Sequence, residues 1–426
     1  MHPASQPLQP TCQTLDWMRQ LPRALSHAQR RTLVLVPGPP PPPTPCPLLR
    51  VGQDECIFKQ FLMSNRAWTV EGYRGLRKKT EGQGVMISGF VDELRGFGLP
   101  MTTDELQRVD VERRARYGED TLPLKASPGV YFLEYGKNKD GYWTGVDAAK
   151  QLEVCVDCYE CVYPGYQIDF KFDYSSGHTA HRDGCLCALK MNVGYGGKQP
   201  IPHASRMTEA CLGPVDKRKL NPGDMQYFFF RDRDETCTGR PDPPPWYAPH
   251  LRPEEYVGKA KGMKQVLWER GLWKEGMVGS IDEDDERDQS FSMTYVLSEC
   301  EDFRNEVTLL EEIAWRRGHI VSFTPKGHCE LAGVGIEYCW GKMKRHYRNN
   351  NDPGGKVDFH KLVVDSMRRE VLPPATAMRF ARKARAYERA YRTGESNSHA
   401  SLESMVKTFK THRNALDFAG KFIDSS

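Results

Sequence analysis

The sequence contains no long apolar run, and this absence argues against a membrane-spanning helix. No stretch of the 426 residues approaches the roughly 18 consecutive apolar side chains that such a helix needs. The first twenty residues also lack the apolar segment of a secretory signal peptide. Hydrophobic residues make up 39% of the chain and charged residues 27%, which is the balance of a globular protein. We therefore expect a protein that is neither secreted nor held in a membrane.

The chain also lacks a strong net charge. Its formal charge is only +4, so the total alone identifies no partner. The distribution is more informative, because residues 282–286 read DEDDE whereas residues 342–392 are dense in Lys and Arg. A local basic segment suits a phosphate backbone, although a solvated helix face accounts for many such runs equally well.

A disulfide framework is not indicated either. The chain has 13 cysteines, an odd number, scattered through expected helices and strands, which argues for reduced thiols. Cys155, Cys158 and Cys161 have a CxxCxxC spacing that could offer thiolates to zinc or an iron–sulfur cluster. The same spacing marks one face of a helix, and no fourth ligand is obvious nearby. Small buried side chains are therefore the competing interpretation.

No internal repeat is visible, and strand and helix patterns mix along the chain. Alternating apolar residues predict strands at residues 48–58, 67–70, 84–93, 166–173 and 319–325. Helical periodicity and the placement of prolines predict helices at residues 145–163, 302–318, the segment around Glu337, 357–371 and 375–393. This order predicts an α/β domain, a mixed sheet flanked by helices.

Composition divides the chain into four parts. Residues 1–47 end in PGPPPPPTPCP, which cannot join a sheet, and form a disordered Pro-rich lead-in. Residues 194–300 are interrupted by Gly and Pro, and we expect an irregular insertion there. The catalytic core is expected in residues 48–193 and 301–350, and basic helices in residues 351–426.

Three acidic residues fall at related places in this pattern. Asp54 lies near the end of the first expected strand, and Asp173 ends a later one. Glu337 lies on the helix after the last strand, among aromatic and basic residues. Strand ends at one edge of an α/β sheet are where sites assemble. Each residue alone is weak evidence, since an Asp at a strand end is often only a turn or cap residue.

Several motifs around these residues resemble the DDE superfamily endonucleases, the mariner-type transposases. The "DES" motif of that family is matched by Asp54-Glu55-Cys56, and its "FDN…H" motif by Phe172-Asp173-Tyr174 with His178. The motif around its catalytic Glu is matched by GIEYCWG at residues 335–341. The resemblance runs from about residue 48 to about residue 413. It implies an RNase H-like fold with a long insertion before the last catalytic helix, and catalysis by Asp54, Asp173 and Glu337.

The chemistry of such a triad follows from its residue types. Cleavage of a phosphodiester builds negative charge on oxygen atoms, which hard divalent cations stabilise. Two Mg²⁺ or Mn²⁺ ions held by carboxylates are suited to this task. We expect Asp173 to be shared between the ions and Asp54 and Glu337 to hold one side each, with Glu337 facing inward. Carboxylates that lie so near to one another titrate as a coupled set, and at least one of them has a raised pKa.

The candidate substrate-binding residues lie close to this triad in the sequence. His178 follows Asp173 by five residues. The basic side chains of the helix that carries Glu337 are expected to face DNA phosphates, and they are Lys342, Lys344, Arg345 and Arg348. Trp340 and Tyr347 of the same helix are expected in the hydrophobic core rather than stacked on bases.

Two functions from different classes remain open at this point. The first is a nuclear, transposon-derived DNA endonuclease or strand transferase, made in the cytoplasm, with DNA as its partner and a homodimer as a candidate assembly. The second is a catalytically silent DNA-binding or interaction protein. The family carries an upstream helix-turn-helix region where this chain has 47 Pro-rich residues, and that departure favours the second function.

Overall fold

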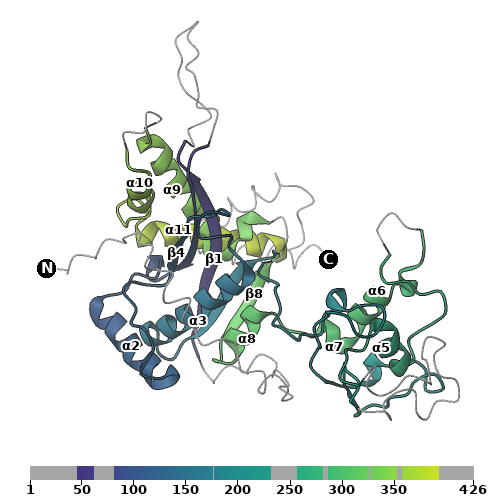
Figure 1. Cartoon of the computed structure of the whole chain (residues 1–426). Helices are drawn as coiled ribbons and strands as arrows, with labels where there is room; N and C mark the ends of the chain where they lie inside the picture. Colours follow the sequence, from purple (N-terminus) through teal and green to yellow (C-terminus); the bar gives the residue numbers. More distant parts are fainter. Residues whose placement is uncertain are drawn as a thin grey trace, which may run out of the picture. The chain divides into compact units, whose positions relative to one another are not determined.

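The computed structural model describes residues 46–61, 81–175, 177–231, 257–281, 286–325, 328–352 and 357–392. These residues fall into two compact units. The described residues of the first lie within 46–180 and 309–392, and those of the second within 181–308. Figure 1 shows the helices and strands of both units. Each unit has its own hydrophobic core.

The first unit is built on a six-stranded mixed sheet with the order β3-β2-β1-β5-β8, in which β4 also pairs with β2. Strand β1 (Leu48–Lys59) runs antiparallel to β2 (Gly84–Asp92) and parallel to β5 (Gln167–Asp173). Strand β8 (Ile320–Thr324) runs parallel to β5. The short strands β3 (Gly96–Phe97) and β4 (Val130–Leu133) run antiparallel to β2. The expected mixed α/β sheet is confirmed.

Helices cover both faces of this sheet (Figure 1). The helices on one face are α2 (Thr103–Tyr117), α3 (Gly145–Val162) and α8 (Leu309–Trp315). Those on the other face are α9 (Ile336–Asn350), α10 (Phe359–Ser366) and α11 (Pro374–Arg392). Successive strand residues point to opposite faces, so Val51 packs in the core beneath α3, and Cys56 and Phe58 pack in the core beneath α9. Residues 54 and 55 must therefore point to different faces.

The second unit includes the described part of the segment 194–300 predicted as an insertion. Its described residues are mostly irregular and contain a buried ion pair. Its regular elements are β6 (Ser205–Arg206), β7 (Met225–Gln226), α5 (Met263–Arg270), α6 (Met293–Glu299) and α7 (Glu301–Arg304). Arg270 is fully buried and donates two hydrogen bonds, of 2.8 and 2.7 Å, to the carboxylate of Asp302. This bidentate contact neutralises the buried guanidinium, whose isolated charge would otherwise be costly.

Most of the predicted elements are confirmed. Strands predicted at 48–58, 84–93 and 166–173 correspond to β1, β2 and β5, and the helix predicted at 145–163 corresponds to α3. The segment at 319–325 corresponds to β8. The last two predicted helices exist, although α10 is shorter than expected and α11 begins at Pro374. The strand predicted at 67–70 lies outside the described residues.

Two predictions about helices were wrong. The single helix expected at 302–318 is divided into α7 and α8 by residues 305–308. Leu309 instead starts α8 by donating its amide proton to the carbonyl of Ala180, at the point where the chain returns to the first unit. Helix α2 was missed because few of its side chains are apolar. Its start carries a capping box, in which the Thr102 hydroxyl accepts from the amide of Glu105 and the Glu105 carboxylate accepts from the amide of Thr102.

Candidate functional site

Strand β1 presents two neighbouring carboxylates, Asp54 and Glu55, to opposite faces of the sheet. The side chain of Asp54 points to the face covered by α9, where its Oδ2 accepts a hydrogen bond of 3.1 Å from Nε1 of Trp340. Its Oδ1 accepts one of 2.8 Å from the amide of Glu55. Asp54 is half-buried, and these two bonds fix the orientation of its carboxylate.

Glu337 lies in the first turn of α9, three residues before Trp340, and so on the same side of the helix as the partner of Asp54. The expectation that it faces inward was wrong, because its side chain is exposed. The buried stripe of α9 is filled instead by Ile336, Cys339, Trp340, Met343 and Tyr347. Glu337 lies next to that stripe, in the first turn of the helix. The expected core positions of Trp340 and Tyr347 are confirmed.

The loop before α9 is seated directly on the two strands that carry the aspartates. A Cβ atom added to Gly333 would lie 2.6 Å from the Cα of Gly52 on β1 and 2.7 Å from the carbonyl oxygen of Lys171 on β5. The next residue, Val334, has a φ of 57°, a left-handed conformation that is strained for a β-branched side chain. This close backbone contact therefore fixes the position of the first turn of α9, and with it the position of Glu337.

We expect Gly333→Ala to destabilise the protein by about 1–3 kcal/mol, because the new methyl group overlaps strand backbone that cannot move aside. Gly341→Ala is a matched control on α9, where an added Cβ meets nothing within 4 Å. That control should raise stability by about 0.5–1 kcal/mol through helix propensity. Chemical denaturation measures both, and equal effects of the two substitutions would contradict the docking of this loop.

The carboxylates of the site act on one another electrostatically. Burial, then repulsion from Glu337, Glu55 and Asp173, raises the pKa of Asp54 to about 8, and the hydrogen bond from the amide of Glu55 opposes the shift. Asp54 and Glu337 thus interact although 283 positions separate them in the sequence. Strand β1, the end of β5 and the start of α9 place their acidic residues in one neighbourhood.

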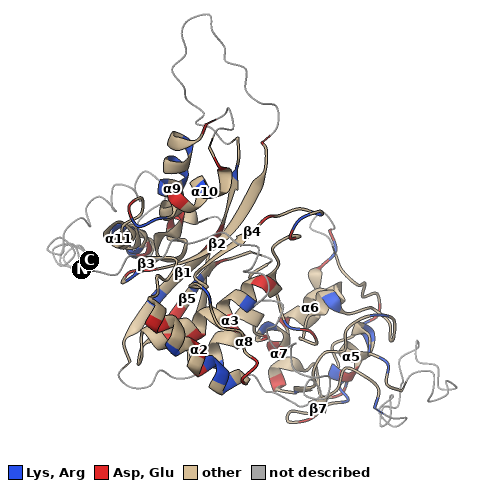
Figure 2. Cartoon of the chain, turned by 60° about the vertical axis from the view of Figure 1, so that its left-hand side comes forward, with Lys and Arg blue, Asp and Glu red and all other residues tan. Residues whose placement is uncertain are grey.

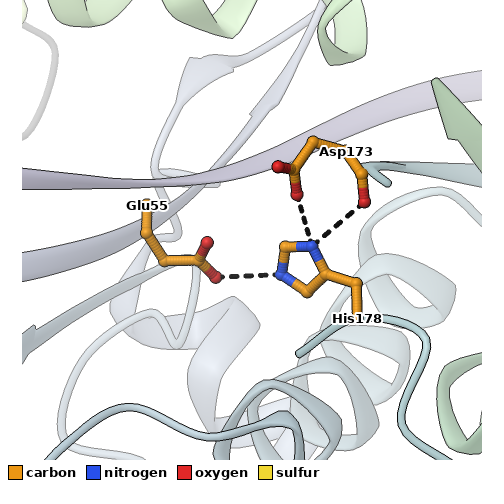
Figure 3. Close-up of side chains that lie close together, drawn as sticks. All are labelled: Glu55, Asp173 and His178. Carbon is orange, nitrogen blue, oxygen red and sulfur yellow. Dashed lines mark hydrogen bonds and ion pairs between the residues drawn. The ribbon is translucent and has the colours of Figure 1, made fainter. Parts of the chain in front are cut away.

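Asp173, the last residue of β5, is linked to Glu55 through His178 (Figure 3). His178 Nδ1 lies 2.5 Å from Oδ1 of Asp173, and Nε2 lies 3.1 Å from Oε1 of Glu55. Burial alone would lower the pKa of His178, but the hydrogen bonds to Asp173 and Glu55 outweigh it and raise that pKa to about 10. These contacts hold the imidazole between two carboxylates and favour its protonated form.

Sequence reasoning placed His178 among the substrate-binding residues, and its environment does not fit that role. The side chain is only 2% exposed, and both ring nitrogens are engaged by protein carboxylates. The sequence signal that could have revealed this is the strand alternation, which turns Glu55 away from Asp54 and toward the face where Phe172 packs against the His178 ring.

The spacing of the donor atoms decides which of these residues could share a metal ion. In the described part of the chain, Glu55, Asp173 and His178 are the one set of three whose ligand atoms all lie within 4.8 Å of one another. Their donors face each other in hydrogen bonds, however, and Oε1 of Glu55 also accepts from Gln53 and Trp143. Asp54, Asp173 and Glu337 do not form such a set among the described residues. Their oxygen donors nevertheless suit a hard divalent cation.

No family model, curated protein or solved structure matches this chain. The expected family membership therefore stays a hypothesis that depends on the motifs and the geometry. Among the described helices, none combines the length and the apolar character that crossing a membrane requires.

Figure 2 colours the Lys and Arg positions of α9 blue, and these residues differ in how far they are buried. Lys344 is half-buried near the thiol of Cys56 on β1. Burial raises the pKa of this thiol to about 12, and the positive charge of Lys344 opposes the rise. Lys342 is also half-buried, whereas Arg345 and Arg348 are exposed. The two arginines are thus the residues of this set that are best placed to reach a large ligand.

The CxxCxxC cysteines lie on α3, and two of them are core residues. Cys155 and Cys158 are completely buried among apolar side chains, and burial raises the pKa of both thiols well above the usual value. Cys161 is partly exposed on the same helix. Neutral thiols packed in a core act as small apolar side chains, and thiolate ligands would require them to ionise.

Proposed function

We propose that this chain is a metal-dependent nuclease or strand transferase that acts on DNA phosphodiesters, with Asp54, Asp173 and Glu337 as its catalytic carboxylates. One observation carries the proposal. Asp54 on β1, Asp173 at the end of the neighbouring parallel strand β5 and Glu337 at the start of α9 lie near one another, and burial, followed by repulsion from Glu337, Glu55 and Asp173, raises the pKa of Asp54 to about 8. Groups perturbed in this way by burial and by like charges are typical of functional sites.

The topology supports an RNase H-like interpretation of the fold. An antiparallel β3-β2-β1 meander is extended by two strands parallel to β1, and helices cover both faces. The motifs that resemble the DDE superfamily endonucleases imply a first Asp within a strand motif and a second Asp after a hydrophobic strand. Asp54 on β1 and Asp173 at the end of β5 match that arrangement.

Each carboxylate has a separate task in this proposal. Mg²⁺ or Mn²⁺ ions, when bound, would supply positive charge for the phosphoryl oxygens and acidify a water molecule. Asp173, whose side chain is 45% exposed, would be shared by two ions. Asp54, oriented by Trp340, and Glu337, carried on the docked start of α9, would each hold one of them. Bound cations would also relieve the repulsion that now raises the pKa of Asp54.

Metal-dependent nicking of supercoiled plasmid DNA tests this function. We expect the full chain to nick in Mg²⁺ or Mn²⁺ and not in EDTA, and Asp173→Asn to lower the rate at least about a hundredfold. Asp120→Asn is the matched control, because it makes the same change at an exposed loop position. Equal background nicking by wild type and Asp173→Asn would instead support a catalytically silent DNA-binding protein.

Phosphate contact by α9 makes a separate prediction. Arg345→Ala and Arg348→Ala should each weaken DNA binding to all sequences alike and reduce the slope of log affinity against log salt by about 1. Lys344→Gln should change that slope less, because Lys344 is half-buried against Cys56. Fluorescence anisotropy across a salt series measures the slopes. An unchanged slope in both arginine variants would remove α9 from the DNA-binding surface.

A further inference from the structure

The geometry points to His178 as a positioning residue, which fixes the carboxylate of Asp173 for metal binding and is itself held by Glu55. This inference rests on the proposed function, because it concerns the same site. Glu55 and His178 lie beside the catalytic carboxylates, and the proposed chemistry gives them no role. The inference assigns each of them one. Glu55 and His178 lie on the face of the sheet opposite to Asp54, beneath α3.

The contact between His178 and Asp173 leaves half of the carboxylate available. Nδ1 of His178 lies 2.5 Å from Oδ1 and 3.2 Å from the backbone oxygen of the same aspartate. Within the described residues, Oδ2 accepts no hydrogen bond, and the side chain is 45% exposed. His178 thus restricts the rotation of the carboxylate and leaves its second oxygen for a cation. Outer partners that orient a ligand in this way contribute strongly to metal affinity.

Glu55 is built into the protein as an anchor. Its Oε1 accepts hydrogen bonds from Nε2 of His178 at 3.1 Å, from Nε2 of Gln53 at 2.7 Å and from Nε1 of Trp143 at 2.9 Å. Gln53 in turn donates to the hydroxyl of Ser88, which donates to Gln151 on α3. Gln53, Ser88 and Gln151 are all buried. A hydrogen-bonded chain therefore runs from the centre of the sheet to Asp173.

Geometry also favours this assignment over a second metal site. A cation placed between Glu55, Asp173 and His178 would break the hydrogen bonds of His178. It would also compete with Gln53 and Trp143 for Oε1 of Glu55.

The Mn²⁺ dissociation constant of the full chain, measured by electron paramagnetic resonance, tests the positioning role without relying on activity. In His178→Asn the amide nitrogen takes the place of Nδ1 and can still donate to Asp173. In His178→Gln it takes the place of Nε2 and reaches toward Glu55 instead. We expect His178→Gln to raise the dissociation constant about 10–100-fold and His178→Asn to raise it about tenfold less. A role in filling space predicts the reverse order, because Asn leaves the larger cavity.

The variant Glu55→Gln distinguishes between two roles of Glu55, as an anchor for His178 and as a metal ligand. The amide oxygen can still accept from His178, so we expect the Mn²⁺ dissociation constant to rise less than tenfold, whereas a lost ligand would match Asp173→Asn. If His178→Gln does not fold, His178→Leu replaces it. Leucine fills more of the histidine volume than asparagine but donates no hydrogen bond, so the positioning role predicts weaker Mn²⁺ binding than in His178→Asn, and a role in filling space predicts the reverse. Equal affinity of wild type and all His178 variants would overturn the positioning role alone. No Mn²⁺ binding by the wild-type chain would overturn the proposed function, and the positioning role with it.

Discussion

In EDTA, Asp54→Asn should make the protein more stable than wild type above about pH 4, and increasingly so up to about pH 8. Asp54 has a pKa of about 8 in the folded protein, against 3.8 as the ordinary value. Below the lower value the group is protonated in both states. As pH rises toward the higher value, the unfolded chain releases the proton while the folded protein retains it, so the free energy of unfolding falls. Asparagine removes this pH dependence.

The pH-dependent part of the difference should reach roughly 2–4 kcal/mol near pH 8, about half of the full conversion, because Asp54 is only half-buried and shares its charge interactions with other carboxylates. Urea denaturation at several pH values measures it, with Asp120→Asn as a control that follows wild type. A difference in unfolding free energy that does not depend on pH, such as one caused by a weaker hydrogen bond from the amide of Glu55, leaves the change of that free energy with pH unaltered. Adding Mg²⁺ in place of EDTA should raise the free energy of unfolding of wild type and should not raise that of Asp54→Asn. Parallel pH profiles of the two proteins in EDTA would contradict the account of Asp54.

Glu337→Gln should lower the rate of plasmid nicking about a hundredfold or more and leave stability within about 0.5 kcal/mol of wild type. The side chain is exposed, so no packing is lost when its charge is removed. Glu337→Asp should also be impaired, because the start of α9 is fixed by the contact of Gly333 with Gly52 and cannot advance to offset the shorter side chain.

Glu112→Gln is the matched control for this prediction, because Glu112 is an exposed helical glutamate on α2, on the other face of the sheet. Single-turnover nicking rates, with thermal unfolding of each variant, separate loss of activity from loss of fold. A Glu337→Gln protein that nicks as fast as Glu112→Gln would exclude Glu337 from the site.

The strands that carry the aspartates could be predicted from the sequence because their apolar residues alternate. Asp173 is the last residue of β5, as the end of its alternating run indicated, and Asp54 lies on β1. The outward placement of Glu337 could not be predicted, because it depends on how Gly333 docks on two strands that are distant in the sequence. Burial of His178 against Glu55 is likewise a tertiary contact between residues 123 positions apart.

The errors in helices have local and non-local causes. Helix α2 escaped because its apolar pattern is weak, although the capping pair Thr102 and Glu105 was visible in the sequence. The break between α7 and α8 has no Gly or Pro to mark it. It arises where the chain passes from one compact unit to the other, which apolar periodicity cannot show.

Calorimetric titration of the full chain with Mn²⁺, in wild type and in Asp173→Asn, tests most directly whether the three carboxylates form one metal centre. The account predicts two bound ions per wild-type chain, severe loss of binding in Asp173→Asn, and wild-type binding in Asp120→Asn. Binding of Mn²⁺ by Asp173→Asn with the stoichiometry and affinity of wild type would contradict it.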